Sequence, residues 1–225
     1  MTSGDGGPLR LVVLVSGSGS NLQALIDAQD DGFRAVGVIS NVADAFGLER
    51  ARRADIPAET LSHRGFADRS EFDRALAELI DRFEPGLVAL AGFMRILTPG
   101  FVAHYAGRMM NIHPSLLPRF RGLHTHQRAL EAGDREHGAS VHFVTAELDG
   151  GPLIIQARVP VRPEDDPDRL AARVLAQEHR IYPEAVRLFA AGRLRLGPAG
   201  ETLLDGRPLA APLTLNARGE AVAPA

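Results

Sequence analysis

The chain has 225 residues, which is long enough for one sizeable hydrophobic core, and no Ser-, Gly- or Pro-rich linker divides it. Its formal net charge of −3 offers no basic field for nucleic acid, and no apolar run approaches the ~20 residues that a membrane span needs. The polar first ten residues do not have the form of a signal peptide, so we expect a single-domain cytoplasmic protein.

Composition also limits the chemistry. The sequence has no cysteine, and its 25 basic residues are all arginine. These absences exclude thiolate nucleophiles, Fe–S clusters, disulfides and Cys-ligated zinc, and also Schiff-base chemistry and the lysine of a phosphate-binding P-loop. Catalysis must therefore use His, Asp, Glu, Asn, Ser, Thr, Tyr or Arg.

The N-terminal half alternates between strands and helices. The hydrophobic run at residues 9–17 is continuous, which indicates a strand buried on both faces of a parallel sheet. A Gly-rich turn and a helix follow it. Strands are predicted over residues 34–41, 56–62 and 86–93, and helices over 46–54 and from Ser70 onward. Ser70 and Asp73 resemble a capping box, and the apolar stripe of that helix contains Phe72, Leu76, Leu79, Ile80 and Phe83.

The C-terminal half is more irregular. Thr98 and Pro99 have the pattern of a helix start, and Asp166 with Pro167 starts a long helix that Pro183 should kink or divide. Strands are predicted over 107–113, 139–145 and 152–161, with a short helix over 125–132. Beyond Arg193 we expect a small hairpin and a loose tail. The predicted fold is a Rossmann-like, doubly wound α/β domain with a mostly parallel sheet over residues 9–209, between a flexible N-terminus (1–8) and a tail (210–225).

Ligands of open α/β sheets bind at the carboxyl ends of the strands, so residues that end strands are the candidates. Gly17, Gly19, Ser20 and Asn21 place backbone N–H groups and two polar side chains at a helix N-terminus, an arrangement that suits phosphate. The pattern lacks the third glycine of a dinucleotide fingerprint, since Leu22 follows, so a phosphate monoester fits it better than NAD.

Asn111 and His113 lie two apart at the end of a predicted strand and therefore point to the same face. A side-chain amide can donate to a developing oxyanion, and an imidazole can supply or remove a proton. Asp149 lies in the tight loop ELDGGP, which can bring its carboxylate to another strand end; beside His113 it would favour the imidazolium and could position a water.

The remaining histidines gather further along the chain. His124 and His126, with His137 and His142 downstream, could suggest a metal, but no Cys or paired carboxylates complete a ligand set, so we expect none. The loop from about Ser115 to Glu136 carries histidines and few apolar anchors, and we expect its ordering to depend on pH.

Five stretches together resemble the phosphoribosylglycinamide formyltransferases, folate-dependent formyltransferases of purine biosynthesis: LVSGSGSNLQALIDA, SNVADAFGLERA, LAGFMRILTPGFV, the run from NIHPSLLPRF to ELDGGPLIIQ, and QEHRIYP. The resemblance runs from about Leu9 to about Leu209. It implies transfer of a formyl group from 10-formyltetrahydrofolate to the amine of glycinamide ribonucleotide. No enzyme nucleophile is required, because the substrate's own amine attacks.

The resemblance also implies residue roles. Asn111, His113 and Asp149 correspond to the catalytic trio. The ribonucleotide would be bound by Gly19, Ser20, Asn21, Arg69 and Glu178, and the folate by Phe93, Met94, Arg95, Ile96, Leu97, Met109, Asn111, His142 and Leu148. Leu175, three residues before Glu178, replaces a polar side chain that related enzymes often have near the phosphate. No metal is implied.

Other activities share this catalytic domain. HPSLLPRFRG also resembles methionyl-tRNA formyltransferase and the formyltetrahydrofolate hydrolases, but both normally carry an extra domain for which 225 residues leave no room. A noncatalytic ribonucleotide or folate sensor is a further alternative, which retention of all three catalytic residue types disfavours. We therefore expect small-molecule substrates, no nucleic acid or membrane partner, and either a monomer or a homodimer.

Overall fold

The computed structural model describes residues 7–223, and contacts divide the chain into two compact units between Met110 and Asn111. The predicted flexible N-terminus, residues 1–8, therefore lies mostly outside the described residues. The predicted boundaries of the formyltransferase domain, 9–209, stay a prediction.

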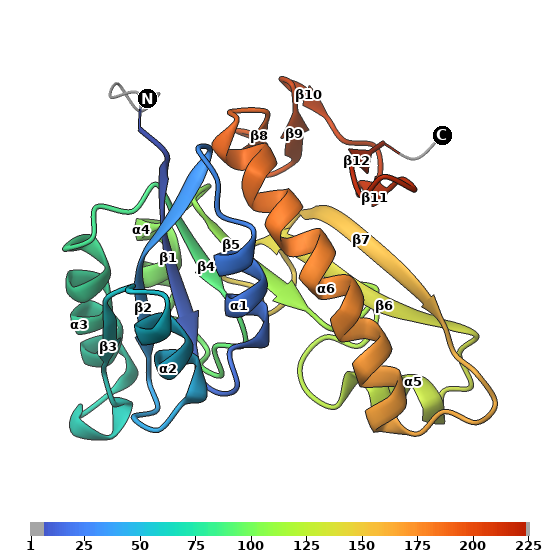
Figure 1. Ribbon diagram of the computed structural model, residues 1–225, viewed down its shortest axis with the longest axis horizontal. Helices are drawn as coiled ribbons and strands as arrows, with labels where there is room; N and C mark the ends of the chain where they lie inside the picture. The colour runs from blue at the N-terminus through green and yellow to red at the C-terminus, as the bar shows by residue number, and fades with distance from the viewer. Residues whose placement is uncertain (1–6, 224–225) are drawn as a thin grey trace. The chain divides into compact units, whose positions relative to one another are not determined.

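Seven strands form the central sheet in the order β3-β2-β1-β4-β5-β6-β7 (Figure 1). The strands are β1 Leu9–Val15, β2 Phe33–Ser40, β3 Ala58–Thr60, β4 Leu87–Leu90, β5 Met109–His113, β6 Glu136–Phe143 and β7 Leu153–Pro160. The helices are α1 Ser20–Asp27, α2 Phe46–Arg53, α3 Arg69–Asp81, α4 Pro99–His104, α5 Thr125–Glu131 and α6 Pro167–Ala190, with a 3₁₀ turn at His63–Gly65. The predicted class, a mostly parallel α/β fold, is confirmed.

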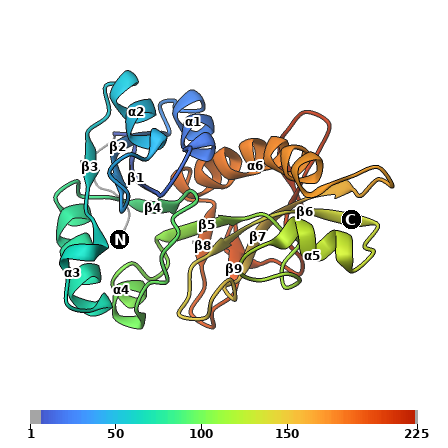
Figure 2. The ribbon, with the colours of Figure 1, turned by 90° about the horizontal axis from the view of Figure 1, so that it is seen from below.

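Strand β1 is the buried centre of the first unit. It pairs in parallel with β2 and β4, and its residues 11–15 are fully buried, as the continuous apolar run predicted. Each fully buried Val or Leu contributes about 1.5–3 kcal/mol relative to an exposed one. Figure 2 shows α1 and α2 on one side of these strands and α3 and α4 on the other, so β1 has apolar neighbours on both faces.

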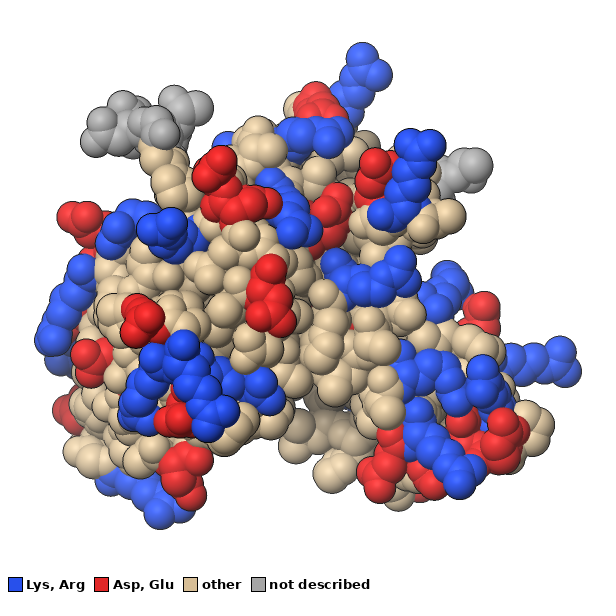
Figure 3. Space-filling model, viewed as in Figure 1, with Lys and Arg blue, Asp and Glu red and all other residues tan. Residues whose placement is uncertain are grey.

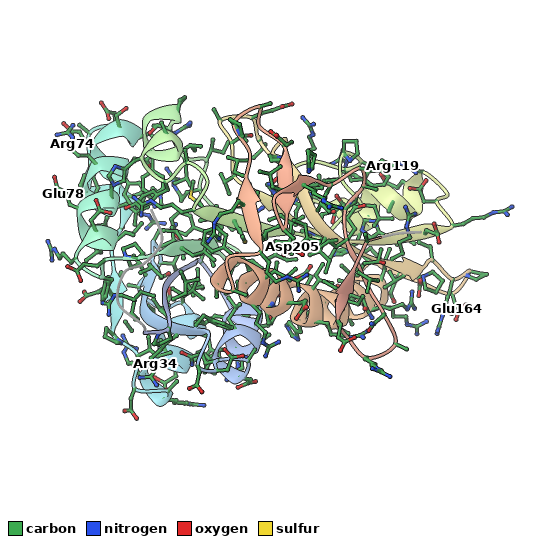
Figure 4. The ribbon with its side chains drawn as sticks, turned by 90° about the horizontal axis from the view of Figure 1, so that it is seen from above. Arg34, Arg74, Glu78, Arg119, Glu164 and Asp205 are labelled. Carbon is green, nitrogen blue, oxygen red and sulfur yellow. The ribbon has the colours of Figure 1, made fainter. Side chains whose placement is uncertain are left out.

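The exposed faces of the helices carry the charge. On α3, Arg74 and Glu78 point away from the strands (Figure 4), opposite the buried stripe of Phe72, Leu76, Leu79 and Ile80. Basic atoms also gather over α2 (Figure 3), where the guanidinium carbons of Arg50 and Arg53 lie 5.0 and 5.7 Å from the centre of the Phe46 ring.

In the second unit, β6 and β7 pair antiparallel, and α6 packs on both of them. α6 continues through Pro183 to Ala190, so this proline does not divide the helix, and the alternative, a kink, stays a prediction. A proline inside a helix costs about 3 kcal/mol. Burial of Val174, Ile181 and Val186 on the same helix offsets that cost.

The end of the chain is more ordered than predicted. β8 (Leu194–Leu196), β9 (Thr202–Leu204) and β10 (Arg207–Pro208) form a three-stranded antiparallel sheet, where a small hairpin was expected. The expected loose tail is wrong for the described residues, because β11 (Thr214–Leu215) pairs with β12 (Ala221–Val222). Leu213 is fully buried, and its N–H donates to the carbonyl of Ile154 at 2.8 Å.

The start of α3 also differs from the prediction. Asp68, rather than Ser70, caps the helix by accepting from the N–H of Glu71 at 2.9 Å. Asp73 is instead buried, and its Oδ2 accepts from the backbone N–H of Thr98 at 2.6 Å. Because Thr98 is itself the N-cap of α4, this bond fixes the start of α4 against α3.

Asp73→Ala should therefore destabilise the protein, because it leaves the N–H of Thr98 without its acceptor. We expect a loss of about 1–3 kcal/mol of unfolding free energy in urea. Asp73→Asn keeps a carbonyl oxygen at the same place and should lose clearly less. Equal losses for the two variants would contradict this role for the hydrogen bond.

Candidate active site

The Gly-rich turn of the first unit links the end of β1 to α1. Gly19 is the N-cap of α1, with a φ of 68° and a ψ of 30°, and no side chain caps the helix. A Cβ at Gly19 would lie 2.6 Å from the Cα of Gly47, so glycine is required both by the backbone conformation and by the close approach to α2. The first backbone N–H groups of a helix have no partner within the helix, which makes this end suitable for an anion.

Residues from α2 hold this turn. The N–H of Gly47 donates to the carbonyl of Gly17 at 3.0 Å, and Arg50 Nε donates to the carbonyl of Ser18 at 2.8 Å. Of the predicted phosphate ligands, Ser20 is half-buried and Asn21 is buried. Arg69, at the first position of α3, is exposed in the same unit.

The segment after β4 lies irregularly between Ala91 and Thr98 and is tied to the end of β1. Ser16 Oγ donates to Asn41 Oδ1 at 2.5 Å and accepts from the N–H of Met94 at 2.8 Å. The side chains of Met94 and Ile96 are 64% and 56% exposed, although both are large and apolar. The other predicted folate residues of this unit are Phe93 and Met109, both buried, and Arg95 and Leu97, both half-buried.

His113 and Asp149 meet in the second unit with nearly all of their side chains buried. His113 Nδ1 lies 3.5 Å from Asp149 Oδ2, and the exposed fractions of the two side chains are 8% and 9%. Asp149 has a φ of 48°, an uncommon conformation for a residue other than glycine. A Cβ at Gly151 would overlap the carbonyl oxygen of Phe143, so the two glycines of ELDGGP allow the close turn that sequence reasoning inferred.

Two backbone groups complete this pair. The carbonyl of Phe120 lies 2.9 Å from His113 Nε2, and the N–H of Gly122 donates to Asp149 Oδ2 at 2.8 Å. A carbonyl can only accept, so Nε2 carries a hydrogen. Both ring nitrogens of His113 thus face acceptors, and only the imidazolium form could donate to both. Sequence reasoning missed these partners because backbone groups leave no residue-type signal.

Asn111 is oriented by His142. His142 Nδ1 lies 2.8 Å from the carbonyl of Phe143 and donates to it, so Nε2 accepts from Asn111 Nδ2 at 3.1 Å. Burial is the main reason that the pKa of His142 is lowered, which favours this neutral tautomer. Since one hydrogen of the Asn111 amide is used here, the second is directed elsewhere. His142 is only 2% exposed and lies behind Asn111.

The remaining candidate residues of the second unit lie on α6 and in the 145–149 loop. Glu178 is buried on α6, and Leu175 is half-buried on the same helix. Leu148 is 52% exposed beside Asp149. Glu147 forms an ion pair with Arg121, which joins this loop to the segment that contains Gly122.

Two histidines, the half-buried His126 and the buried His137, lie close together at the 115–136 segment. The rings of His126 and His137 are 5.2 Å apart, and Phe120 lies 6.0 Å from His137. His137 is 1% exposed, and neither of its ring nitrogens has a hydrogen-bond partner among the described residues. Burial, with a smaller contribution from His126, lowers the pKa of His137 to about 4.

Within residues 7–223, no group of three or more His, Asp or Glu side chains could hold a metal ion. None of the helices in the same range combines the length and the apolar character that a membrane span requires.

A cavity of about 370 Å³ lies elsewhere in the second unit. It is lined by Leu116, Leu117, Pro118, Arg119, Asp134, Arg135, Glu136, Gln156 and Arg158, and includes none of the predicted site residues.

Comparison with known proteins decides the family. The formyl transferase family matches residues 9–186, which is most of the chain. The chain belongs to the formyl transferase family. Among its relatives, phosphoribosylglycinamide formyltransferase of Escherichia coli is 56% identical over 89% of this chain and 96% of its own length. The human trifunctional purine biosynthetic protein adenosine-3 is 45% identical over 85% of this chain and 19% of its own length.

Solved structures of formyl transferases agree. The phosphoribosylglycinamide formyltransferase of Coxiella burnetii has a TM-score of 0.86 and 55% identity, covering 90% of this chain and 96% of that one. Glycinamide ribonucleotide transformylase 1 of Symbiobacterium toebii has a TM-score of 0.85 and 47% identity, covering 89% and 95%. The resemblance to the phosphoribosylglycinamide formyltransferases that the sequence predicts is thereby confirmed. The chain is an enzyme of the transferase class.

The state of His137 predicts a pH dependence of stability. The unfolded chain takes up a proton near pH 6.5, whereas the folded chain resists it down to about pH 4. The stability is therefore fully present above about pH 6.5 and falls as the pH drops toward 4. Between pH 7.5 and 5.0, urea unfolding should show a loss of about 2 kcal/mol from this residue.

His137→Leu should remove that component, whereas His104→Gln, which alters an exposed side chain of the first unit, should keep it. The amides of residues 114–126 should also exchange faster at pH 5.0 than at 7.5, after correction for intrinsic rates, in the wild type but not in His137→Leu. The same pH dependence in all three proteins would contradict the assignment.

Proposed function

We propose that this formyl transferase moves the formyl group of 10-formyltetrahydrofolate to the amine of glycinamide ribonucleotide, giving formylglycinamide ribonucleotide and tetrahydrofolate in purine biosynthesis. The observation that carries the proposal is the buried meeting of His113 with Asp149, beside an Asn111 amide held by His142. This set supplies hydrogen-bond donors and a proton acceptor but no nucleophile. It therefore suits a reaction in which the substrate brings its own attacking amine.

Asn111 and His113 are proposed as the oxyanion donors. When the amine attacks the formyl carbon, negative charge develops on the formyl oxygen, and donors aimed at that position lower the barrier. Asn111 would donate its remaining amide hydrogen. His113 would share its Nδ1 hydrogen between Asp149, 3.5 Å away, and the formyl oxygen, because Phe120 engages Nε2. Mutagenesis of such donors in other enzymes typically costs 10²–10³-fold in kcat per donor.

Asp149 is proposed to hold His113 and to move a proton. The attacking amine must lose a proton, and the folate nitrogen must gain one as its bond to the formyl carbon breaks. Asp149 can accept the first proton and return it to the leaving nitrogen through water, so the carboxylate ends the cycle unchanged. Its N–H partner at Gly122 keeps the carboxylate oriented toward the ring throughout.

The ribonucleotide contacts are proposed from each unit separately. In the first unit, the N–H groups at Gly19, Ser20 and Asn21 would bind the phosphate, with Arg69 as the cationic partner. In the second unit, Glu178 would accept from the ribose hydroxyls. Leu175 on the same helix offers no polar group to the phosphate, which places more of the binding on Arg69.

The folate contacts are proposed around Met94 and Ile96. Two large apolar side chains exposed on one irregular segment suit the flat face of a pterin, and the backbone of Arg95 and Leu97 offers polar groups to its edge. Phe93 and Met109 are buried in the first unit and would support this segment, and His142 is buried in the second unit and would orient Asn111. Leu148 and Asn111 would meet the ligand in the second unit.

We also propose the setting of the reaction. The substrates are small molecules and the biosynthetic reaction is a cytoplasmic one, with no nucleic acid or membrane partner and no metal. The net charge of −3 offers no basic field for nucleic acid. The chain would act as a monomer or a homodimer, which sedimentation velocity distinguishes.

The test is a spectrophotometric assay with purified protein and 10-formyltetrahydrofolate, with and without glycinamide ribonucleotide. Deformylation only in the presence of the ribonucleotide, with formylated ribonucleotide as the product, supports the proposal. Equal deformylation without the ribonucleotide would indicate a hydrolase instead. No reaction in either case would indicate another acceptor or a binding protein.

Asp149→Asn should abolish most turnover, because the amide keeps the shape of the side chain but cannot take the proton. We expect a fall in kcat of about 10²–10⁴-fold, with folate affinity measured by fluorescence changing little. Glu164→Gln, which changes an exposed carboxylate of the second unit outside the 145–149 loop, is the control. Wild-type turnover in Asp149→Asn would exclude the assigned role.

Arg69→Ala should weaken ribonucleotide binding selectively, because a guanidinium on a phosphate is a strong charge-assisted contact. We expect the KM for the ribonucleotide to rise about 10-fold or more, with the folate KM within about twofold. Arg74→Ala removes another exposed arginine of α3 and should change neither. Equal changes in both KM values for Arg69→Ala would reject the phosphate assignment.

A further inference from the structure

The segment from Phe120 to His124 has an unusual backbone. Phe120, Gly122 and His124 have φ values of 53°, 76° and 58°, so three of five residues are left-handed. Two of them are not glycine, and a residue with a side chain adopts such a conformation only at an energetic cost. A segment of this kind keeps its shape only when its surroundings impose it.

The same segment provides both backbone partners of the catalytic pair. The carbonyl of Phe120 accepts from His113 Nε2, and the N–H of Gly122 donates to Asp149 Oδ2. A rotation of either peptide plane would break one of these bonds. The orientation of His113 and Asp149 therefore depends on what fixes residues 120–123.

Arg128 is the side chain that reaches this segment from α5. Its Nη1 donates to the carbonyl of Arg121 at 2.6 Å and to that of Leu123 at 3.3 Å. Its guanidinium carbon also lies 5.4 Å from the centre of the Phe120 ring. Arg128 thus binds the carbonyls on both sides of Gly122, and its guanidinium lies over the aromatic ring of Phe120.

Arg119 provides an internal comparison. Its guanidinium also lies over the Phe120 ring, at 4.9 Å, and it pairs with Asp134 at 2.8 Å. Among the described residues it donates to neither the carbonyl of Arg121 nor that of Leu123. The two arginines (Arg119 is labelled in Figure 4) share the ring contact and differ in the backbone contacts.

We propose that Arg128 is a positioning residue, which holds residues 120–123 in the left-handed conformation that presents the Phe120 carbonyl to His113 and the Gly122 N–H to Asp149. Arg128 touches neither of the two catalytic side chains. It acts through the backbone. The catalytic part of this inference rests on the proposed function.

Loss of Arg128 should therefore affect the chemical step more than binding. In Arg128→Ala, the two carbonyls lose their donor and the peptide planes of the segment gain freedom, so His113 and Asp149 lose their fixed partners. A misplacement of about 1 Å can cost 10²-fold in rate. We expect kcat to fall about 10- to 100-fold, with both KM values within about twofold.

The experiment compares Arg128→Ala, Arg128→Lys, Arg128→Gln and Arg119→Ala with the wild type, each checked by circular dichroism and urea unfolding. Arg128→Lys keeps a cationic donor and should recover part of kcat. Arg119→Ala should keep kcat within about twofold. If Arg128→Ala does not fold, Arg128→Gln takes its place, because it removes the guanidinium and keeps a neutral donor. Its kcat and KM values are then compared with those of the wild type.

A second readout does not need substrate. The Nε2 proton of His113, held by the Phe120 carbonyl, should give a slowly exchanging imidazole resonance in ¹⁵N-histidine-labelled protein. It should be lost or exchange faster in Arg128→Ala and stay in Arg119→Ala. This readout tests the positioning role even if the wild type shows no formyl transfer, which would count against the proposed function alone.

Three results would overturn the inference. The first is an Arg128→Ala protein with wild-type kcat and an unchanged His113 resonance. The second is an equal loss of kcat in Arg119→Ala, because ring contact would then suffice. The third is a loss of kcat that follows the loss of stability across all the variants, which a general structural role would produce.

Discussion

A buried imidazole that faces a buried carboxylate is the contact on which the proposed catalytic site of the second unit depends. His113 and Asp149 come from positions 36 apart in the chain, and both have given up nearly all of their hydration. Burying ionisable groups is costly unless hydrogen bonds replace the lost water. The fold meets that requirement from the main chain, with a carbonyl for the ring and an N–H for the carboxylate.

Hydrogen bonds to the backbone also hold the turn after β1 in the first unit. This turn is held by two donors to its carbonyls, the N–H of Gly47 and the Nε of Arg50. Ser16 acts in the same way at the end of the strand, where one hydroxyl contacts both Asn41 and the backbone of Met94. In the first unit, the side chains of Arg50 and Ser16 therefore hold the backbone that is proposed to bind the ligands.

Sequence reasoning succeeded where a signal is local and failed where it depends on tertiary contacts. The continuous run at residues 9–17 predicted the buried β1, and the spacing of Asn111 and His113 predicted two polar groups on one strand. The start of α3 was misplaced because Asp68 and Ser70 are both good caps, and burial of Asp73 against Thr98 is invisible in the sequence. The order of residues 213–222 depends on the contact of Leu213 with β7, 58 residues earlier at Ile155, so local composition could not predict it.

The left-handed segment between Phe120 and His124 has a consequence for how such sites vary between proteins. The groups it contributes are a carbonyl and an amide, which nearly every residue type possesses. Substitutions in this segment can change the residue type and keep the hydrogen bonds. An inserted or deleted residue would displace the Phe120 carbonyl and the Gly122 N–H together. The number of residues between His113 and α5 is therefore constrained more tightly than their identity. In an alignment of related sequences, the absence of insertions and deletions would mark this segment, whereas residue identity would not.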